Sequence, residues 1–127
     1  MSIVSDIEKL KKEKNAVILA HYYVDEDVQD IADYIGDSFY LSKVATKVDQ
    51  DRIIFAGVEF MGESAKILNP DKRVFMPDMN ADCPMAHMAD KEEILKLREE
   101  YDDLAVVCYI NSTAELKKYS DVCVTSS

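Results

Sequence analysis

Polar and ring-bearing side chains follow the apolar, strand-like runs of this 127-residue chain. Because ligands bind at the carboxyl ends of strands in open α/β sheets, we expect these side chains to share one site. Hydroxyl, imidazole, amide and thiol groups with few carboxylates suit a small anion that carries carboxylate or phosphate groups. The residues concerned are His21, Tyr22 and Tyr23, then Gly57 and Glu59, Asp78 and Cys83, Tyr109 and Asn111, and Thr125 and Ser126.

Each of these residues also has a purely structural interpretation. His21 could be a hydrogen-bonded residue at a strand boundary, and Tyr23 an amphipathic side chain at the edge of the sheet. Ser38 and Ser126 could cap helices. The residues alone leave both interpretations open.

Cys83 lies in the loop Asn80–Pro84, where a thiol has no core to fill. It is therefore available to a metal or a substrate. One cysteine with His87 four residues later falls short of the four ligands of a zinc site. Neither standard glycine-rich phosphate loop occurs in the chain.

Short apolar runs alternate with helical patterns along the chain. Runs that are apolar without alternation, separated by helices, are typical of parallel strands covered on both faces. Right-handed crossovers then place the carboxyl ends of all strands on one edge. We expect strands at residues 16–19, 52–56, 73–76, 105–110 and 122–124, and helices at residues 5–14, 28–35, 38–48, 60–68, 90–97 and 112–119.

Three local signals mark the expected helix ends. Ser5 with Glu8 and Ser112 with Glu115 have the spacing of capping boxes. Gly36 has the position of a helix C-cap, since glycine tolerates the left-handed conformation.

The chain also contains a weak internal repeat. A charged amphipathic helix followed by AVILAHYY returns as KEEILKLREEY followed by AVVCYIN, so that Ala105 stands 89 residues after Ala16. On this basis residues 1–84 form a first αβα unit and residues 85–127 the beginning of a second. The alternative is that all βα units look alike.

Charge and apolar content exclude several classes of protein. The net charge of −10 disfavours a nucleic-acid partner, which needs a basic surface. The longest uncharged stretch is too short to span a membrane, and the N-terminus lacks the order of a signal peptide. We expect a cytoplasmic protein with reduced thiols, in which Cys108 and Cys123 are packed in apolar strand-like runs.

Four segments resemble, in order, the successive signatures of quinolinate synthase, the NadA family. They read ILAHYYVDEDVQDIADYIGDS, FAGVEFMGESAKILNPDK, MPDMNADCPMA and YINSTAELKKYSDVCVTSS. The resemblance implies three αβα units in a pseudo-threefold triangle, of which this chain holds the first and the start of the second. It also implies a transferase of NAD biosynthesis that condenses iminoaspartate with dihydroxyacetone phosphate, with L-aspartate oxidase or dehydrogenase as supplier of iminoaspartate.

The resemblance further implies a [4Fe–4S] cluster held by three cysteines, whose open iron acts as a Lewis acid. Cys83 matches the first cluster ligand, and Tyr23 matches a tyrosine that moves protons. Tyr22 stands where the family often has Asn, so the proton-transfer role stays open between Tyr22 and Tyr23. The remaining matches are to substrate-binding positions, namely His21, Ser38, Tyr109, Ile110, Asn111 and Ser126.

Cys108 and Cys123 do not match the other two ligand positions. With one of three ligands, we expect these 127 residues alone to form an incomplete and inactive portion of the enzyme. The alternative from another class is a cluster-free α/β module that binds small anions.

Overall fold

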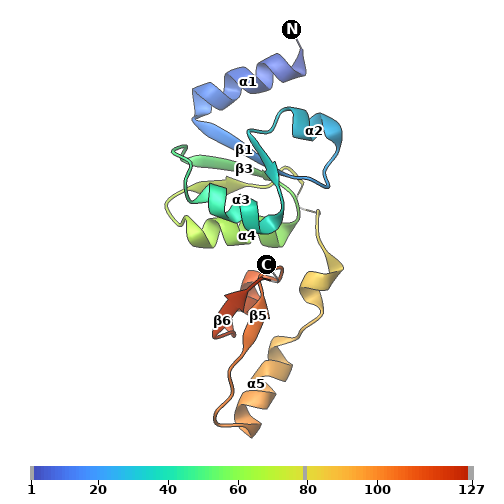
Figure 1. Ribbon diagram of the computed structural model, residues 1–127, viewed down its shortest axis with the longest axis vertical. Helices are drawn as coiled ribbons and strands as arrows, with labels where there is room; N and C mark the ends of the chain where they lie inside the picture. The colour runs from blue at the N-terminus through green and yellow to red at the C-terminus, as the bar shows by residue number, and fades with distance from the viewer. Residues whose placement is uncertain (1, 79, 126–127) are drawn as a thin grey trace. The chain divides into compact units, whose positions relative to one another are not determined.

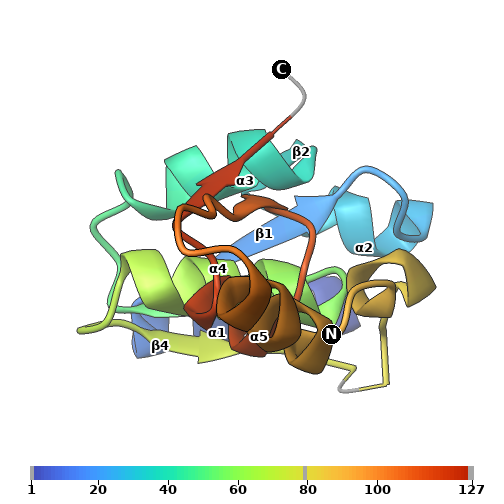
Figure 2. The same ribbon diagram turned by 90° about the horizontal axis from the view of Figure 1, so that it is seen from below.

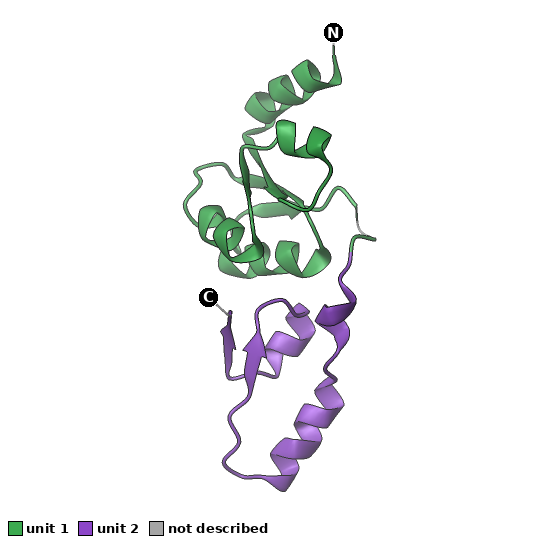
Figure 3. Ribbon diagram, turned by 45° about the vertical axis from the view of Figure 1, so that its right-hand side comes forward, with its two compact units in different colours: residues 1–81 green, residues 82–127 purple. Residues whose placement is uncertain are grey.

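The computed structural model describes residues 2–78 and 80–125. It divides into two compact units, residues 1–81 and residues 82–127, shown in two colours in Figure 3. Each unit contains its own sheet, and every strand pair in both sheets is parallel. The predicted α/β class is therefore confirmed. No helix among the described residues is both long and apolar enough to cross a membrane.

The first unit is a four-stranded sheet in the order β2-β1-β3-β4 with helices on both sides. In Figures 1 and 2, α3 and α4 lie side by side on one face, and α1 and α2 lie on the other side. Its elements are α1 (Ile3–Lys14), β1 (Ala16–His21), α2 (Glu26–Asp30), β2 (Tyr34–Gly36), α3 (Ser38–Ala45), β3 (Arg52–Ala56), α4 (Glu59–Leu68) and β4 (Arg73–Phe75).

The core of this unit lies between the sheet and α3. Val17 pairs with Ile53 and Leu19 with Phe55 in the register of β1 and β3. Because side chains alternate along a strand, these four residues share one face. Together with Leu41 of α3 they are the largest fully buried side chains. Each contributes about 1.5–3 kcal/mol by leaving water.

The segment before α3 differs from the sequence prediction. The expected helix at residues 28–35 ends at Asp30, and Tyr34–Gly36 is a strand paired with β1. Gly36 is therefore not a helix C-cap. The left-handed residue in the described chain is Asn15, with φ 52°, which ends α1.

The predicted helix starts are also shifted. The N-cap of α1 is Ser2, whose hydroxyl accepts from the Ser5 amide at 3.2 Å, so Ser5 does not form the capping box. Asp37, rather than Ser38, caps α3 by accepting from the Tyr40 amide at 2.7 Å. The cap must have an extended backbone immediately before the helix, and in each case a polar residue upstream of the predicted one meets this condition.

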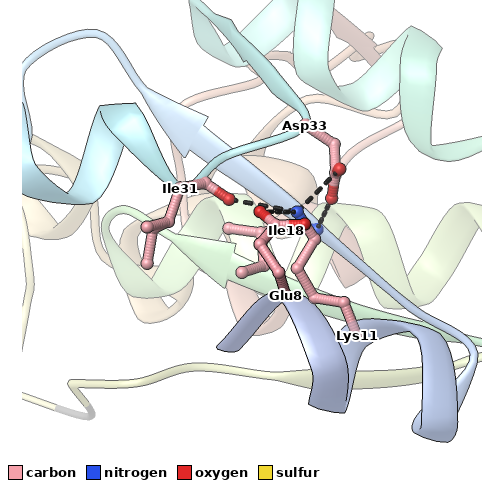
Figure 4. A network of polar contacts seen from close by, with 5 residues as sticks. All are labelled: Glu8, Lys11, Ile18, Ile31 and Asp33. Atoms are coloured by element: carbon pink, nitrogen blue, oxygen red, sulfur yellow. Dashed lines mark hydrogen bonds and ion pairs between the residues drawn. The ribbon is translucent and has the colours of Figure 1, made fainter. Parts of the chain in front are cut away.

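A charged cluster explains why β2 begins where it does (Figure 4). The Asp33 amide donates to the Ile18 carbonyl, and the Asp33 carboxylate accepts from the Ile18 amide, both at 2.8 Å. The Lys11 ammonium lies 2.8 Å from Asp33 and 3.1 Å from Glu8, and donates to the Ile31 carbonyl at 3.2 Å. We call this cluster the Asp33 clasp, since it ties α1 and β2 to β1.

The Lys11 side chain is only 11% exposed, yet it stays charged. Burial lowers its pKa, but the hydrogen bonds to Asp33 and Glu8, together with the charges of these two carboxylates, raise the pKa above the ordinary value of lysine. An ion pair held in this way must keep both partners, because a buried charge without a partner is costly.

The second unit contains a 3₁₀ turn η1 (Pro84–His87), α5 (Lys91–Glu100), β5 (Val107–Tyr109), α6 (Ala114–Lys118) and β6 (Val122–Val124). The strand expected at residues 105–110 is thus shorter, and β6 agrees with its prediction. The cap of α6 is Thr113 and not Ser112, because the Thr113 hydroxyl accepts from the Leu116 amide.

The two units repeat the same arrangement, which confirms the internal repeat. Leu19 pairs with Tyr34 in the first unit and Val107 with Val122 in the second, an offset of 88 residues for both strands. Helices α2 and α6 begin and end at the same offset. The repeat length is therefore 88 residues and not the predicted 89.

The second unit also repeats the clasp. The Asp121 amide donates to the Val106 carbonyl at 2.9 Å, and the Asp121 carboxylate accepts from the Val106 amide at 2.7 Å. Arg98 of α5 donates to the same carboxylate at 2.9 Å and to the Tyr119 carbonyl at 3.1 Å. The hydrogen bond from Val106, and then that from Arg98, hold the pKa of Asp121 below its ordinary value.

The faces of the two sheets differ in exposure. Leu19 is fully buried, whereas Val107 at the equivalent position is 61% exposed. Val122 and Val124 of β6 are exposed as well. The buried apolar side chains of the second unit include instead Cys108 of β5 and Leu116 of α6.

We predict that Asp33→Ala lowers the free energy of unfolding by about 1–3 kcal/mol, because the variant leaves the Ile18 amide without its acceptor and removes one of the two carboxylates that hold Lys11. Urea denaturation measures this loss, and faster hydrogen exchange at the Ile18 amide places it at the clasp. Glu13→Ala is the matched control. It removes an exposed 3.8 Å ion pair with Lys9, and such pairs contribute less than about 1 kcal/mol. Equal stability of the two variants would contradict the role given to Asp33.

Candidate functional site

Three rings gather at the carboxyl end of β1. The ring of His21 stacks on Tyr22 with centroids 4.6 Å apart, and it lies 4.8 Å from the ring of Tyr23. The two tyrosine rings are 4.5 Å apart. We call these residues the aromatic triad. Tyr23 is 82% exposed, whereas His21 is partly buried, so the triad presents phenol groups to solvent above an anchored imidazole.

The triad is held by a turn. The Val24 amide donates to the His21 carbonyl at 3.0 Å, and the Tyr22 amide donates to the Gly36 carbonyl at 3.1 Å. The amide group of Gln29 in α2 donates to the carbonyls of Tyr22 and Val24 at 3.1 and 2.8 Å. Gln29 is therefore a positioning residue, and it was not predicted from the sequence. The signal that could have indicated it is a side-chain amide shortly after the turn, because such a group has two N–H donors for backbone carbonyls.

His21 is neutral in this arrangement. Its Nδ1 atom accepts from the Tyr23 amide at 3.1 Å, which leaves the proton on Nε2. Burial lowers the pKa of His21, and the nearby charge of Asp37 opposes this effect only in part. The imidazole can therefore donate one hydrogen bond from Nε2 to an anion near neutral pH.

The two tyrosines are not equivalent. A hydrogen bond to Tyr23 is the largest cause that raises the pKa of Tyr22, followed by the charge interaction with Tyr23. A phenol with a raised pKa gives up its proton less readily. Proton loss from Tyr22 is therefore made harder by its neighbour Tyr23.

Ser38 lies at the start of α3, at the same edge of the sheet as the triad. Since Asp37 caps this helix, capping does not account for the Ser38 hydroxyl. The first turn of a helix presents backbone N–H groups that favour anions. Gly36 is required here by close packing, because a Cβ atom at this position would lie 2.3 Å from Cδ1 of Tyr40.

Cys83 lies on the loop that opens the second unit. Its amide donates to the Asp82 carboxylate at 2.8 Å, and its carbonyl accepts from the Ala86 amide at 3.0 Å. The other carboxylate oxygen of Asp82 lies 2.7 Å from Nε2 of His87. The Asp82–His87 pair, which the sequence analysis did not predict, thus shapes the backbone around a partly exposed thiol.

Tyr109, Ile110 and Asn111 follow β5 as the aromatic triad follows β1. At the 88-residue offset Tyr109 is equivalent to His21. The Ile110 amide donates to the Val124 carbonyl at 2.7 Å, as the amide of Tyr22 does to Gly36. The predicted residues therefore occupy equivalent places in the two units. Ser126, which is equivalent in sequence to Ser38, lies outside the described residues.

The predicted cluster ligand can be tested against the donor groups. Within residues 2–78 and 80–125, no group of three or more His, Cys, Asp or Glu side chains could hold a metal ion. Cys83 fits a single thiolate ligand, since it is accessible on a loop and has no packing role. Cys108 and Cys123 instead pair within the β5–β6 sheet. The described residues therefore fit one ligand of a cluster and not a complete set.

Comparison with known proteins gives a consistent result. Residues 5–127 match the NadA family, described as quinolinate synthetase A protein. A quinolinate synthase of Fusobacterium nucleatum is 69% identical over 121 residues, which cover 95% of this chain and 41% of that protein. Quinolinate synthases of Clostridium perfringens (strain 13) and Pyrococcus abyssi are each 58% identical over 127 residues, the whole of this chain and 42% of theirs. The chain spans about two fifths of the length of these curated relatives.

We predict that His21 titrates below the ordinary histidine pKa and that its neutral form carries the proton on Nε2. Long-range ¹H–¹⁵N NMR spectra measure both properties. Asp37→Asn should lower the pKa further, because the carboxylate of Asp37 raises it, while Asn keeps the helix cap.

The lowered pKa of His21 also makes the stability of the fold depend on pH. A histidine with a depressed folded-state pKa stabilises the fold fully above its unfolded pKa of about 6.5, and this contribution is lost as the pH falls through the folded pKa. A pKa of His21 that rises in Asp37→Asn would contradict the assignment.

Proposed function

The chain belongs to the NadA (quinolinate synthetase A) family, and from this membership we propose that it forms part of the active site of a quinolinate synthase. The proposed reaction condenses iminoaspartate with dihydroxyacetone phosphate to quinolinate for de novo NAD biosynthesis in the cytoplasm. L-Aspartate oxidase or dehydrogenase would supply the unstable iminoaspartate. The observation that carries this proposal is the family match, which extends over residues 5–127.

We assign the repeat seen in this chain to the first unit and the beginning of the second unit of a pseudo-threefold architecture. The 88-residue offset of β1–β2 and β5–β6 supports this assignment, because two units already share one plan. The rest of the second unit and a third unit would come from the part of the relatives' length that this chain does not span.

Substrate carboxylates would be held by neutral donors. In the first unit these are Nε2–H of His21, the Ser38 hydroxyl and the first turn of α3. The equivalent positions in the second unit hold Tyr109, Ile110, Asn111 and Ser126, which supply a phenol, an amide and a hydroxyl. Such donors bind an anion without a dense positive field, in agreement with the acidic composition of the chain.

Tyr23 would move protons during the condensation. The residue is 82% exposed, and its phenol lies beside His21 in the aromatic triad. The Tyr23 amide also fixes the tautomer of His21 through Nδ1. One residue would therefore orient the imidazole with its backbone and exchange protons with its side chain.

Cys83 would hold a [4Fe–4S] cluster together with two cysteines from outside this chain. When bound, the cluster supplies an open iron that acts as a Lewis acid on a substrate oxygen or nitrogen atom. The role of this chain is to present the thiolate, and the hydrogen bond from the Cys83 amide to Asp82 supports it by fixing the loop backbone. With one ligand of three, the 127 residues alone would be inactive.

A cluster-free module that binds small anions is the second candidate. The specific observation in its favour is that the aromatic triad and Ser38 all belong to the first unit. Anion binding there needs no metal. The two candidate functions predict different results when this chain is joined to the remaining part of a relative. A quinolinate synthase would then catalyse the reaction, whereas an anion-binding module would only bind.

We predict that a chimera, in which this chain replaces the matching segment of the Clostridium perfringens relative, forms quinolinate under anaerobic conditions with reconstituted iron and sulfide. Tyr23→Phe should lower kcat roughly 10²–10⁴-fold, the usual contribution of a general acid–base group. Tyr22→Phe is the matched control and should change kcat only a few-fold. An inactive chimera that still binds quinolinate would favour the anion-binding module, and equal losses in the two variants would remove the distinction between Tyr22 and Tyr23.

We predict that Cys83→Ser in the same chimera abolishes both the visible absorption of the cluster and quinolinate formation. Cys108→Ala should keep both and cost about 1–2 kcal/mol of stability through a small cavity. Anaerobic reconstitution followed by absorption spectroscopy measures the first effect, and urea denaturation the second. Loss of the cluster in Cys108→Ala would mean that the wrong thiol is assigned.

A further inference from the structure

Two of the three cysteines face each other across neighbouring strands. Cys108 of β5 and Cys123 of β6 are direct partners in the register of the parallel pair. Directly paired residues point to the same face of a sheet, and neighbouring strands lie about 4.8 Å apart. This spacing falls within the roughly 4.4–6.8 Å between Cα atoms that a disulfide requires.

The two thiols are also in contact. Burial raises the pKa of Cys123, and the neighbouring Cys108 thiol raises it further, first through its charge and then through a side-chain hydrogen bond between the two residues. The Cys108 thiol donates to the Tyr109 carbonyl at 3.3 Å. Cys108 is 6% exposed whereas Cys123 is exposed. A small reagent can therefore reach Cys123 directly, whereas Cys108 is shielded from solvent.

Neither packing nor the proposed cluster accounts for this pair. At the 88-residue offset the equivalent residues of the first unit are Ala20 and Ile35, which are also paired across β1 and β2. The same strand pair thus forms without thiols. A buried cysteine alone would be an ordinary core residue. Two cysteines at paired positions of neighbouring strands can instead react with each other.

We propose that Cys108 and Cys123 form a reversible disulfide, with a low-molecular-weight disulfide as the oxidant. The Cys123 thiolate attacks one sulfur of the reagent, which gives a mixed disulfide and releases one thiol. The Cys108 thiolate then attacks the Cys123 sulfur, forms the protein disulfide and releases the second thiol. Two protein thiols are oxidised and one reagent disulfide is reduced, so atoms and electrons balance.

The bond would lie one residue before Tyr109 and two before Ile110. The amide of Ile110 already bonds to Val124 across the same two strands. The disulfide would therefore fix the strand ends from which residues 109–111 continue. This proposal rests on the geometry of the β5–β6 pair and is independent of the proposed function, so either can fail alone.

The closed bond is expected to be easily reduced. Parallel strands hold paired Cβ atoms about as far apart as the strands themselves, which exceeds the mean of about 3.8 Å in disulfides. The strands must approach slightly, and strained disulfides have more oxidising potentials. Among the described strands, β6 pairs on one side only, so it can make this movement.

The test uses the reduced 127-residue chain and oxidised glutathione under anaerobic conditions. Intact-mass spectrometry should show the loss of two hydrogen atoms, with one thiol left for alkylation. Peptide mapping should find Cys108 joined to Cys123 and the free thiol at Cys83, and dithiothreitol should restore all three thiols. A bond that includes Cys83, or a glutathione adduct that stays on Cys123 without closure, overturns the proposal.

Two variants separate the steps. Cys83→Ser should still lose two hydrogen atoms at an unchanged rate. Cys108→Ala, which copies the residue found at Ala20, should stop at the mixed disulfide and accumulate the glutathione adduct on Cys123. The unsubstituted chain in urea is the reference for proximity. If closure is as fast in urea as in the folded chain, the strand register does not bring the thiols together and the proposal is wrong.

Discussion

Both units depend on one interaction, in which an aspartate carboxylate takes the place of a backbone carbonyl as the acceptor of a hydrogen bond between adjacent strand segments. Asp33 accepts from the Ile18 amide of β1, Asp121 accepts from the Val106 amide immediately before β5, and each aspartate is held by a cation from a helix. This fixes the first residue of a three-residue edge strand. Because a slip of one residue turns every side chain to the other face, the clasp also determines that His21 lies opposite Gly36 and Tyr109 opposite Val124.

The elements with long apolar runs could be predicted from the sequence, and the edge strand could not. Residues 16–20 and 53–56 are apolar over nearly a full strand length, so β1 and β3 were expected. Strand β2 is three residues long and follows apolar residues at helical spacing. The residue that determines where β2 begins is Asp33. Its role can be recognised only when the structure places it beside Ile18.

The residues of the candidate site also divide into those that could be predicted from the sequence and those that could not. His21, Tyr22 and Tyr23 were recognisable because polar rings directly follow a buried strand. Gln29 was not, since its contacts are with backbone carbonyls that a sequence does not display. The roles of Asp37 and Asp82 were not predicted, because each is next to a residue with a more evident role, Ser38 or Cys83. The repeat was visible in the pattern, but only the strand register gave its length.

The clasps also have a consequence for the order of folding. Ile18 and Asp33 are 15 residues apart in sequence, as are Val106 and Asp121. Parallel pairing is ordinarily delayed by the entropy of closing a long crossover, whereas the cost of a short loop is small. Each strand pair can therefore close from its own residues alone. During synthesis, β1 and β2 can pair before β3 has left the ribosome, and the aromatic triad takes its place with them.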